Sequence, residues 1–222
     1  MSIENYERAG CRDVFHSYLL ENANYVGNLE LPAIKTNRIE IPTKLVKFSE
    51  IFLTKDYDAY VHFYQDDCKF ERIWNNPLKY FKQLKKFKGV IAPDFSVYRD
   101  MPLIMQFWNI FRSRAIAQGM IDYGINVIPN IRYGDERTYG ISCEGIEKNS
   151  IIAVGSHGCI KGIEDRKYSI DGFDFIIKQL QPKIVILYGS KPDKLFNRFE
   201  NLTDIIQFKD SFYSKEASDG DR

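Results

Sequence analysis

KGVIAPDFS, residues 88–96, is the most informative stretch of this chain. Its apolar run, VIA, is too short for an independent helix and lies between a glycine and a proline, so it predicts a buried β-strand. Asp94 follows at the point where the strand gives way to a loop and then to a long helical pattern. In parallel sheets this edge is where ligands bind, which makes Asp94 the first candidate functional residue.

The same layout recurs along the chain, where short apolar segments alternate with helical patterns. Apolar strands without polar alternation are typical of a parallel sheet that is buried on both faces. The pattern therefore predicts an α/β fold, with a mainly parallel sheet flanked by helices, arranged as a doubly wound sheet or an incomplete (β/α) barrel. The expected strands are 43–48, 58–64, 90–93, 125–131, 151–154, 183–187 and 204–208, and the expected helices lie near 77–87, 102–123, 171–180 and 192–200.

We expect one α/β domain over residues 1–213, in which residues 1–40 form an irregular N-terminal extension. Residues 214–222 are polar and are expected to be a mobile tail. The apolar pattern between Tyr133 and Ile151 is too short to predict a crossover helix there.

Composition restricts the class of protein. Hydrophobic residues make up 44% of the 222 residues, which excludes a mainly disordered chain. The net charge of +1 gives no global field that would attract nucleic acid or a membrane surface. The polar start of the chain does not resemble a signal peptide, and there is no apolar run of about 18 residues. Four scattered cysteines without a CxxC pair favour reduced thiols in a cytoplasmic protein.

Polar residues follow the ends of the predicted strands, and in a parallel sheet these ends share one edge. Carboxylates brought together there could bind a divalent metal ion through oxygen ligands, with Asp66, Asp67 and Asp94 as the candidates. They could instead share a proton, with Asp67 or Asp94 acting as a catalytic acid or base, or simply cap the following turns. The other members of this edge are Ser96, Asn130, Arg132, Ser156, His157 and Tyr188.

An arginine interrupts the apolar stripe of the long helix. Every position of the stripe 103, 107, 110, 114, 117 and 121 is apolar except Arg114. Arg112 lies three residues from Asn109, so these two share a neighbouring face. We expect Arg112 or Arg114 to pair with a strand-end aspartate or to bind an anion, the alternative being an ion pair that only fixes the helix to the sheet.

Two further segments carry weaker signals. The glycines around Ser156 and His157 would let backbone amides approach a phosphate, although a plain tight turn has the same composition and no dinucleotide or P-loop motif is present. A basic run follows Pro77, and it is either a solvated helix face or a contact surface for the phosphates of nucleic acid. Its lysines are Lys79, Lys82, Lys85 and Lys86.

Several of these segments together resemble a known family. HFYQDDCKFERIWNNP (62–77), VIAPDFSVYRDMP (90–102), QFWNIFRSRAIAQ (106–118) and GINVIPNIRYGD (124–135) are similar in sequence and order to the DUF4417 family. IIAVGSHGCIKG (151–162) and QPKIVILYG (181–189) fit its C-terminal part. The resemblance implies an uncharacterised protein of bacteria, archaea and phages, often carried on mobile elements, and it supplies no reaction and no cofactor.

The leading functional hypothesis is a small polar pocket at the carboxyl edge of the sheet. It would bind an anionic or phosphate-bearing small ligand, a nucleotide being one candidate, with or without a divalent metal. The residues expected to bind the ligand are Asn109, Arg112, Arg114, Asn130, Arg132, Ser156, His157 and Tyr188. The alternative is an accessory protein of a phage or mobile element that binds nucleic acid or a host protein.

Overall fold

The computed structural model describes residues 13–35, 40–156 and 162–209 of the chain. It confirms the α/β class, because parallel strands alternate with helices along the sequence. One sheet has four strands and a second has three, and every pairing within them is parallel. The strands are β3 (Leu45–Lys47), β4 (Tyr60–His62), β5 (Gly89–Ile91), β6 (Val127–Ile128), β7 (Ile151–Gly155), β8 (Ile184–Tyr188) and β9 (Asp204–Phe208).

The two sheets are continuous where β6 meets β7. Residues just beyond β6 form a parallel bridge between Asn130 and Ala153. The Ala153 amide donates to the Pro129 carbonyl at 2.8 Å, and the Ile131 amide donates to the Ala153 carbonyl at 2.9 Å. The strands therefore follow one another from β3 to β9 in sequence order. A doubly wound sheet reverses its strand order, so the observed order is that of an incomplete (β/α) barrel.

The inner face of this barrel has its own apolar cluster, to which all of the strands from β3 to β9 contribute. Tyr60, Ile91, Ile128, Ala153 and Ile186 are buried in it. Their alternate neighbours along each strand face outward into a larger core beneath the helices. Having both faces buried explains why these strands lack polar alternation.

Two glycines make room for large rings inside the barrel. Gly89 lies opposite Tyr60 in the pairing of β4 with β5, and a Cβ atom there would come within 2.2 Å of the Tyr60 ring. Gly155, at the end of β7, faces Tyr64 in the same way, with a contact of 2.9 Å. The barrel interior therefore requires glycine at both positions.

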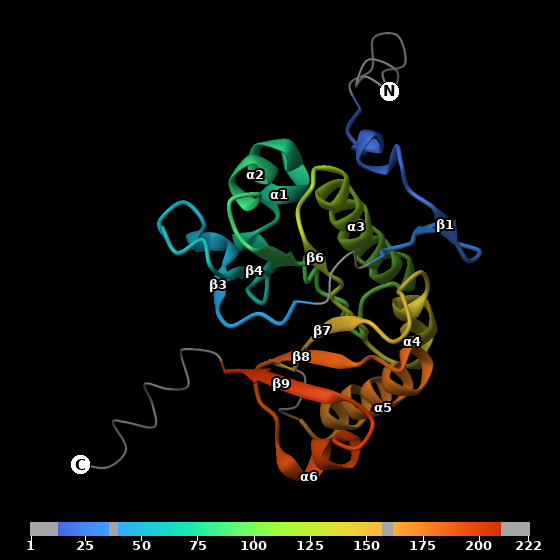
Figure 1. The fold of residues 1–222 in the computed structure, drawn as a ribbon. Helices are drawn as coiled ribbons and strands as arrows, with labels where there is room; N and C mark the ends of the chain where they lie inside the picture. The colour runs from blue at the N-terminus through green and yellow to red at the C-terminus, as the bar shows by residue number, and fades with distance from the viewer. Residues whose placement is uncertain (1–12, 36–39, 157–161, 210–222) are drawn as a thin grey trace.

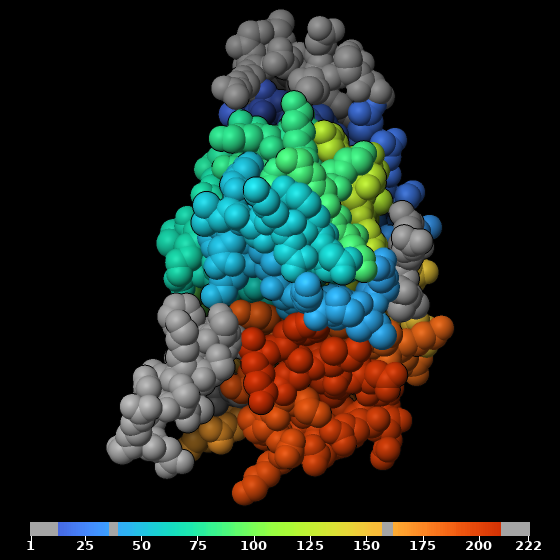
Figure 2. Space-filling model, turned by 60° about the vertical axis from the view of Figure 1, so that its left-hand side comes forward, coloured from blue at the N-terminus to red at the C-terminus, as the bar shows by residue number. Residues whose placement is uncertain are grey.

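Helices cover the outside of the barrel and follow one another around it (Figure 1). On the face seen in Figure 2, the half that contains β3 packs directly against the half that contains β9. The outer core is filled mainly by apolar side chains of α2, α3 and α5 against the backs of the strands. The helices are α1 (Arg72–Asn75), α2 (Pro77–Leu84), α3 (Leu103–Asp122), α4 (Glu136–Cys143), α5 (Ile163–Leu180) and α6 (Asp193–Phe196).

Three helices differ from the sequence prediction, which gave no helix at the single turn of α1 (Arg72–Asn75). Residues 136–143 form α4, which the sequence pattern did not predict, because only two turns are present and the apolar stripe is correspondingly short. Asp135 caps α4 by accepting a hydrogen bond from the Arg137 amide. Helix α5 begins at Ile163, eight residues before the predicted start, since its first turns are polar and face away from the core.

The described part of the predicted N-terminal extension has some regular structure. A 3-10 turn (Ser17–Leu20) and the antiparallel pair β1 (Tyr25–Val26) and β2 (Leu31–Pro32) lie along α3. Leu19 and Leu31 are buried. This segment covers the outer side of α3, which explains why the helix is buried on all sides between Arg112 and Met120.

Two predictions fall on residues outside the described ranges, namely His157 and the tail 214–222. Among the helices that the structure describes, none combines the length and the apolar composition needed to cross a bilayer.

Replacing Phe173 with alanine tests the outer core. Phe173 is 1% exposed and contacts the rings of Phe196 and Phe199, so the variant should lose roughly 3–5 kcal/mol of unfolding free energy. Phe175, two residues along the same helix, is 38% exposed and serves as the matched control, with an expected loss below about 1 kcal/mol. Urea denaturation of both variants measures the difference, and equal losses would contradict the packing described.

Candidate functional site

A cleft of about 920 Å³ opens at the carboxyl ends of the strands. Its walls come from the ends of β3 and β7, from the segments that follow β4, β5 and β6, and from the first turns of α5. This volume is in the range of small-molecule binding sites. The convergence of strand ends that the sequence predicts therefore produces a real concavity.

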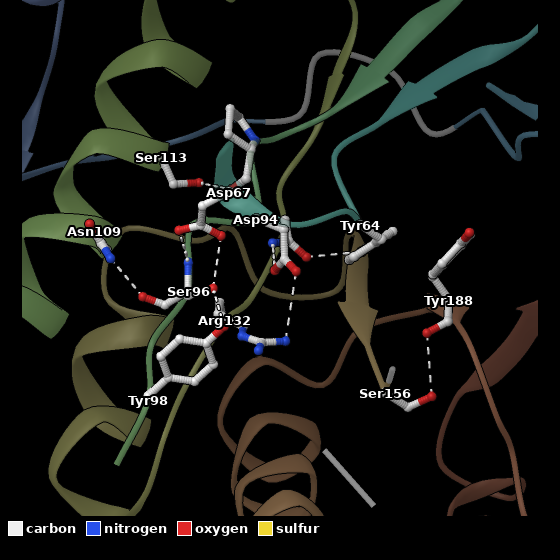
Figure 3. A network of polar contacts seen from close by, with 12 residues as sticks. Tyr64, Asp67, Asp94, Ser96, Tyr98, Asn109, Ser113, Arg132, Ser156 and Tyr188 are labelled. Atoms are coloured by element: carbon white, nitrogen blue, oxygen red, sulfur yellow. Dashed lines mark hydrogen bonds and ion pairs between the residues drawn. The ribbon is translucent and has the colours of Figure 1, made fainter. Parts of the chain in front are cut away.

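Asp94 forms the centre of a polar network in the floor of this cleft (Figure 3). Its Oδ1 atom accepts a hydrogen bond of 2.7 Å from Asn130 Nδ2, and the Tyr64 hydroxyl donates to Asn130 Oδ1 at 2.9 Å. Arg132 lies on the other side, with Nη1 at 3.7 Å from Asp94 Oδ2. The segments after β4, β5 and β6 thus contribute one residue or more each to a single cluster.

Burial governs the ionisation of this cluster. The Asp94 side chain is only 10% exposed, and its removal from water raises the pKa of the carboxyl. The Arg132 charge and the Asn130 hydrogen bond act in the opposite direction, while the nearby Asp67 charge raises the pKa further. Burial also raises the pKa of Tyr64 well above its ordinary value, so its hydroxyl stays protonated and keeps donating to Asn130.

A stack of rings supports the network from inside the barrel. Tyr64 and Tyr188 lie nearly parallel, with ring centroids 4.7 Å apart, and His62 packs against Tyr188 at 4.5 Å. These rings come from the end of β4 and the end of β8, on different sides of the barrel. They fill its mouth below the cleft and fix the position of the Tyr64 hydroxyl.

Asp67 holds two loops together. Its carboxylate accepts hydrogen bonds from the Ser96 amide at 3.1 Å and from the Ser96 hydroxyl at 2.8 Å. Asn109 in α3 donates to the Ser96 carbonyl at 2.6 Å. Asp67 therefore joins the segment after β4 to the segment after β5, and its carboxylate does more than cap the turn that follows it.

The two arginines of α3 do not pair with strand-end aspartates, contrary to the first of the two sequence expectations. Arg112 forms an ion pair with Glu71, donates from Nη2 to Asn109 Oδ1 at 2.7 Å, and lies over the Phe95 ring at 4.0 Å. Arg114 donates from Nη2 to the Ser142 carbonyl at 2.6 Å. Neither arginine lines the cleft. The sequence placed them on the correct face of the helix but could not show that other partners lie closer.

The remaining predicted residues are divided between the cleft and its surroundings. Ser156 donates to the Ser190 carbonyl at 2.7 Å, which ties the end of β7 to the loop after β8, and Tyr188 belongs to the ring stack. Asp66 lines the cleft but forms a salt bridge with Lys69 at 2.9 Å. Within the described residues no group of three or more His, Cys, Asp or Glu side chains is arranged to hold a metal ion, so Asp66, Asp67 and Asp94 do not form such a group.

Sequence reasoning missed several residues of the cleft. Arg99 pairs with Asp165 at 2.6 Å and lies over the Tyr168 ring at 4.5 Å, which joins the loop after β5 to the first turns of α5. The apolar alternation of Val61 and Phe63 indicates only the outward face of this strand, so it does not point to Tyr64. The alternate positions of YVHFY are all aromatic or histidine, a signal that could have indicated the barrel interior.

Comparison with known proteins places the chain in a family. The model of the domain of unknown function DUF4417 matches residues 23–209. The chain belongs to the DUF4417 family. The matched range begins at the segment that covers α3 and ends after β9, so it spans the whole barrel and the cleft. No solved structure matches this DUF4417 chain.

Phage proteins are among the relatives of this DUF4417 chain. It is 31% identical over 129 residues to the Gene 1 protein of Mycobacterium phage L5, which covers 58% of this chain and 56% of that protein. It is 29% identical over 129 residues to the Gene 1 protein of Mycobacterium phage D29, covering 58% of this chain and 48% of that protein. The chain therefore matches about half the length of these curated relatives.

The network makes a direct prediction for the titration of Asp94, measurable by carboxyl carbon NMR. Its pKa should lie above the ordinary aspartate value near 3.8, rise further in Arg132→Gln, and fall in Asp67→Asn, because these neighbours act with opposite signs. Since the folded-state pKa is raised, the contribution of Asp94 to stability is fully present below about pH 3.8 and is lost as the pH rises through the folded value. A wild-type pKa at or below the ordinary value would contradict the description.

Proposed function

We propose that this protein binds a small anionic ligand, with nucleotides and other phosphate-bearing molecules as the leading class, in the cleft at the carboxyl edge of the barrel. The observation that carries the proposal is the pair of the buried Asp94 and the partly buried Arg132 in a cleft of about 920 Å³. A buried aspartate beside a guanidinium in a concave site is a common marker of a functional site.

Arg132 is the proposed anion-binding group. It lines the cleft with Nη1 at 3.7 Å from Asp94 Oδ2, and a guanidinium can bind phosphate oxygens through charge-assisted hydrogen bonds. The first turn of α5 contains Glu164 and Asp165, which disfavour an anion at that helix end. The anionic group of the ligand is therefore assigned to Arg132 and not to the start of α5.

Tyrosines support a nucleotide as the ligand. Tyr98, Tyr133 and Tyr168 line the cleft, and tyrosine rings are good surfaces for stacking a base. Asp94 would accept hydrogen bonds from ligand groups that donate. Because its pKa is raised by burial, Asp94 is also our candidate for any acid–base step on the bound ligand. This binding mode relies on Arg132 and does not require a metal ion.

A cytoplasmic location is part of the proposal. The described cysteines, Cys68 and Cys143, are both free thiols, as is usual in a reducing compartment.

Calorimetric titration with a panel of nucleoside mono- and triphosphates and inorganic phosphate tests the proposal. We expect saturable binding of at least one of them, weakened roughly tenfold or more in Arg132→Gln through the loss of charged hydrogen bonds. Arg137→Gln is the matched control, since Arg137 pairs with Asp135 and does not line the cleft. The affinity of this variant for the same compound should stay within about twofold of that of the wild type. Equal affinity in the two variants, or no binding of any compound, would rule the proposal out.

A second candidate function is nucleic-acid binding or host-protein binding by an accessory protein of a phage or mobile element. The relatives named Gene 1 protein come from phages, and Lys79, Lys82, Lys85 and Lys86 are exposed on and after α2. Two of these lysines are already engaged, because Lys85 donates to the Tyr123 carbonyl at 3.0 Å and Lys86 donates to Gln83 at 2.8 Å. This favours the small-ligand proposal.

Fluorescence anisotropy with a labelled DNA duplex at several salt concentrations separates the two candidates. We expect weak binding that is the same in the wild type and in a variant with glutamine at all four lysines. A nucleic-acid binder that uses this face would instead show an affinity that falls steeply with salt, with a slope of about −0.9 per phosphate contact, and the variant would lose that slope.

A further inference from the structure

Tyr98, Ser96 and Asp67 form a chain of hydrogen bonds at the wall of the cleft (Figure 3). The Ser96 hydroxyl donates to Asp67 Oδ1 at 2.8 Å, and the same hydroxyl oxygen lies 3.0 Å from Tyr98 Oη. Ser96 and Tyr98 line the cleft, whereas Asp67 does not. Ser96 is 8% exposed and Tyr98 is 53% exposed, so the chain leads from a shielded hydroxyl to one that a ligand can reach.

The hydrogen atoms of this chain can point in only one direction. A carboxylate has no hydrogen to donate, so the Ser96 hydrogen must lie in the contact with Asp67. A hydroxyl carries a single hydrogen, so Ser96 can only accept in its contact with Tyr98, and the Tyr98 hydroxyl must donate there. Tyr98 Oη therefore has no hydrogen left for a ligand and offers the ligand only its lone pairs.

The polar groups of the cleft around this chain differ in what they offer. Arg132 offers only donors, which suit the oxygens of a phosphate. Tyr98 Oη offers an acceptor, and Asp94 offers carboxylate oxygens. Inorganic phosphate would satisfy Arg132 but would leave the acceptors without a donor. A site whose polar groups are matched to a donor on the ligand discriminates against a ligand that lacks the donor.

We propose that Tyr98 Oη accepts a hydrogen bond from the nucleoside part of the ligand, so that Tyr98 distinguishes a nucleotide from inorganic phosphate. This inference rests on the nucleotide binding proposed above. The donor is a neutral O–H group of the ribose or a neutral N–H group of the base. Asp67 is a positioning residue, because it fixes the direction of the Tyr98 hydrogen through Ser96 and does not line the cleft.

Calorimetric titration of Tyr98→Phe tests the role of the hydroxyl, because this variant keeps the ring. The probes are nucleoside mono- and triphosphates, their 2′,3′-dideoxy forms and inorganic phosphate. We expect the variant to bind the preferred nucleotide roughly tenfold more weakly than the wild type. If the difference disappears with the dideoxy form, the donor belongs to the ribose. If the difference persists with that form, the donor belongs to the base.

Asp67→Asn tests the direction of the chain. The Ser96 amide donates to Asp67 Oδ2 at 3.1 Å and can only donate, so it should keep the asparagine oxygen as its acceptor. The asparagine nitrogen then donates to the Ser96 hydroxyl, Ser96 donates to Tyr98, and the Tyr98 hydrogen turns toward the ligand. Asp67→Asn should weaken nucleotide binding roughly tenfold in the presence of Tyr98 and by less than about twofold in the Tyr98→Phe background.

Tyr57→Phe is the control, because Tyr57 is 37% exposed and does not line the cleft, and nucleotide affinity should stay within about twofold of the wild type. Unchanged nucleotide binding in Tyr98→Phe would overturn this inference and leave the proposed nucleotide site standing. An equal effect of Asp67→Asn in both backgrounds would overturn the hydrogen-bond chain. The absence of binding by any nucleotide would overturn both proposals. If Asp67→Asn does not fold, Tyr98→Phe decides by itself.

Discussion

Every strand from β3 to β9 runs parallel to its neighbours, and this one constraint determines where the polar ends of the strands lie. Parallel strands in sequence order must all finish at the same rim of the barrel. Both faces of each strand are buried, so the strand residues are mainly apolar. Polar residues therefore occur where the strands end. The cleft, the Asp94 network and the loop contacts of Asp67 all follow from that geometry.

The price of burying Asp94 is offset by its neighbours. Asn130 donates to one carboxylate oxygen and Arg132 faces the other, while Tyr64 fixes the orientation of the Asn130 amide. The ring of Tyr64 is itself held by the stack on Tyr188 and by the absence of a side chain at Gly155. The packing of the barrel interior and the electrostatics of the cleft are therefore linked through a single tyrosine.

Much of this architecture could be predicted from the sequence, because strand periodicity and strand-end chemistry are local properties. The strands, the long helix and the convergence of Asp94, Asn130 and Arg132 belong to this class. The ion-pair partners of the helix arginines could not be predicted from the sequence. Arg112 pairs with Glu71 and not with a strand-end aspartate, and this depends on distances between elements far apart in the chain. Short helix α4 was missed for a related reason, because two turns carry too little periodic signal and its stability comes from packing.

The central claim is that the ends of separate strands act as one unit at the barrel mouth. A double-mutant cycle between Tyr64→Phe and Asn130→Ala, read as unfolding free energies from urea denaturation, tests this most directly. Their hydrogen bond joins the end of β4 to the segment after β6 across the intervening strand. We expect an interaction energy on the order of 1 kcal/mol, as for directly contacting buried groups. Strict additivity of the two changes would contradict the claim.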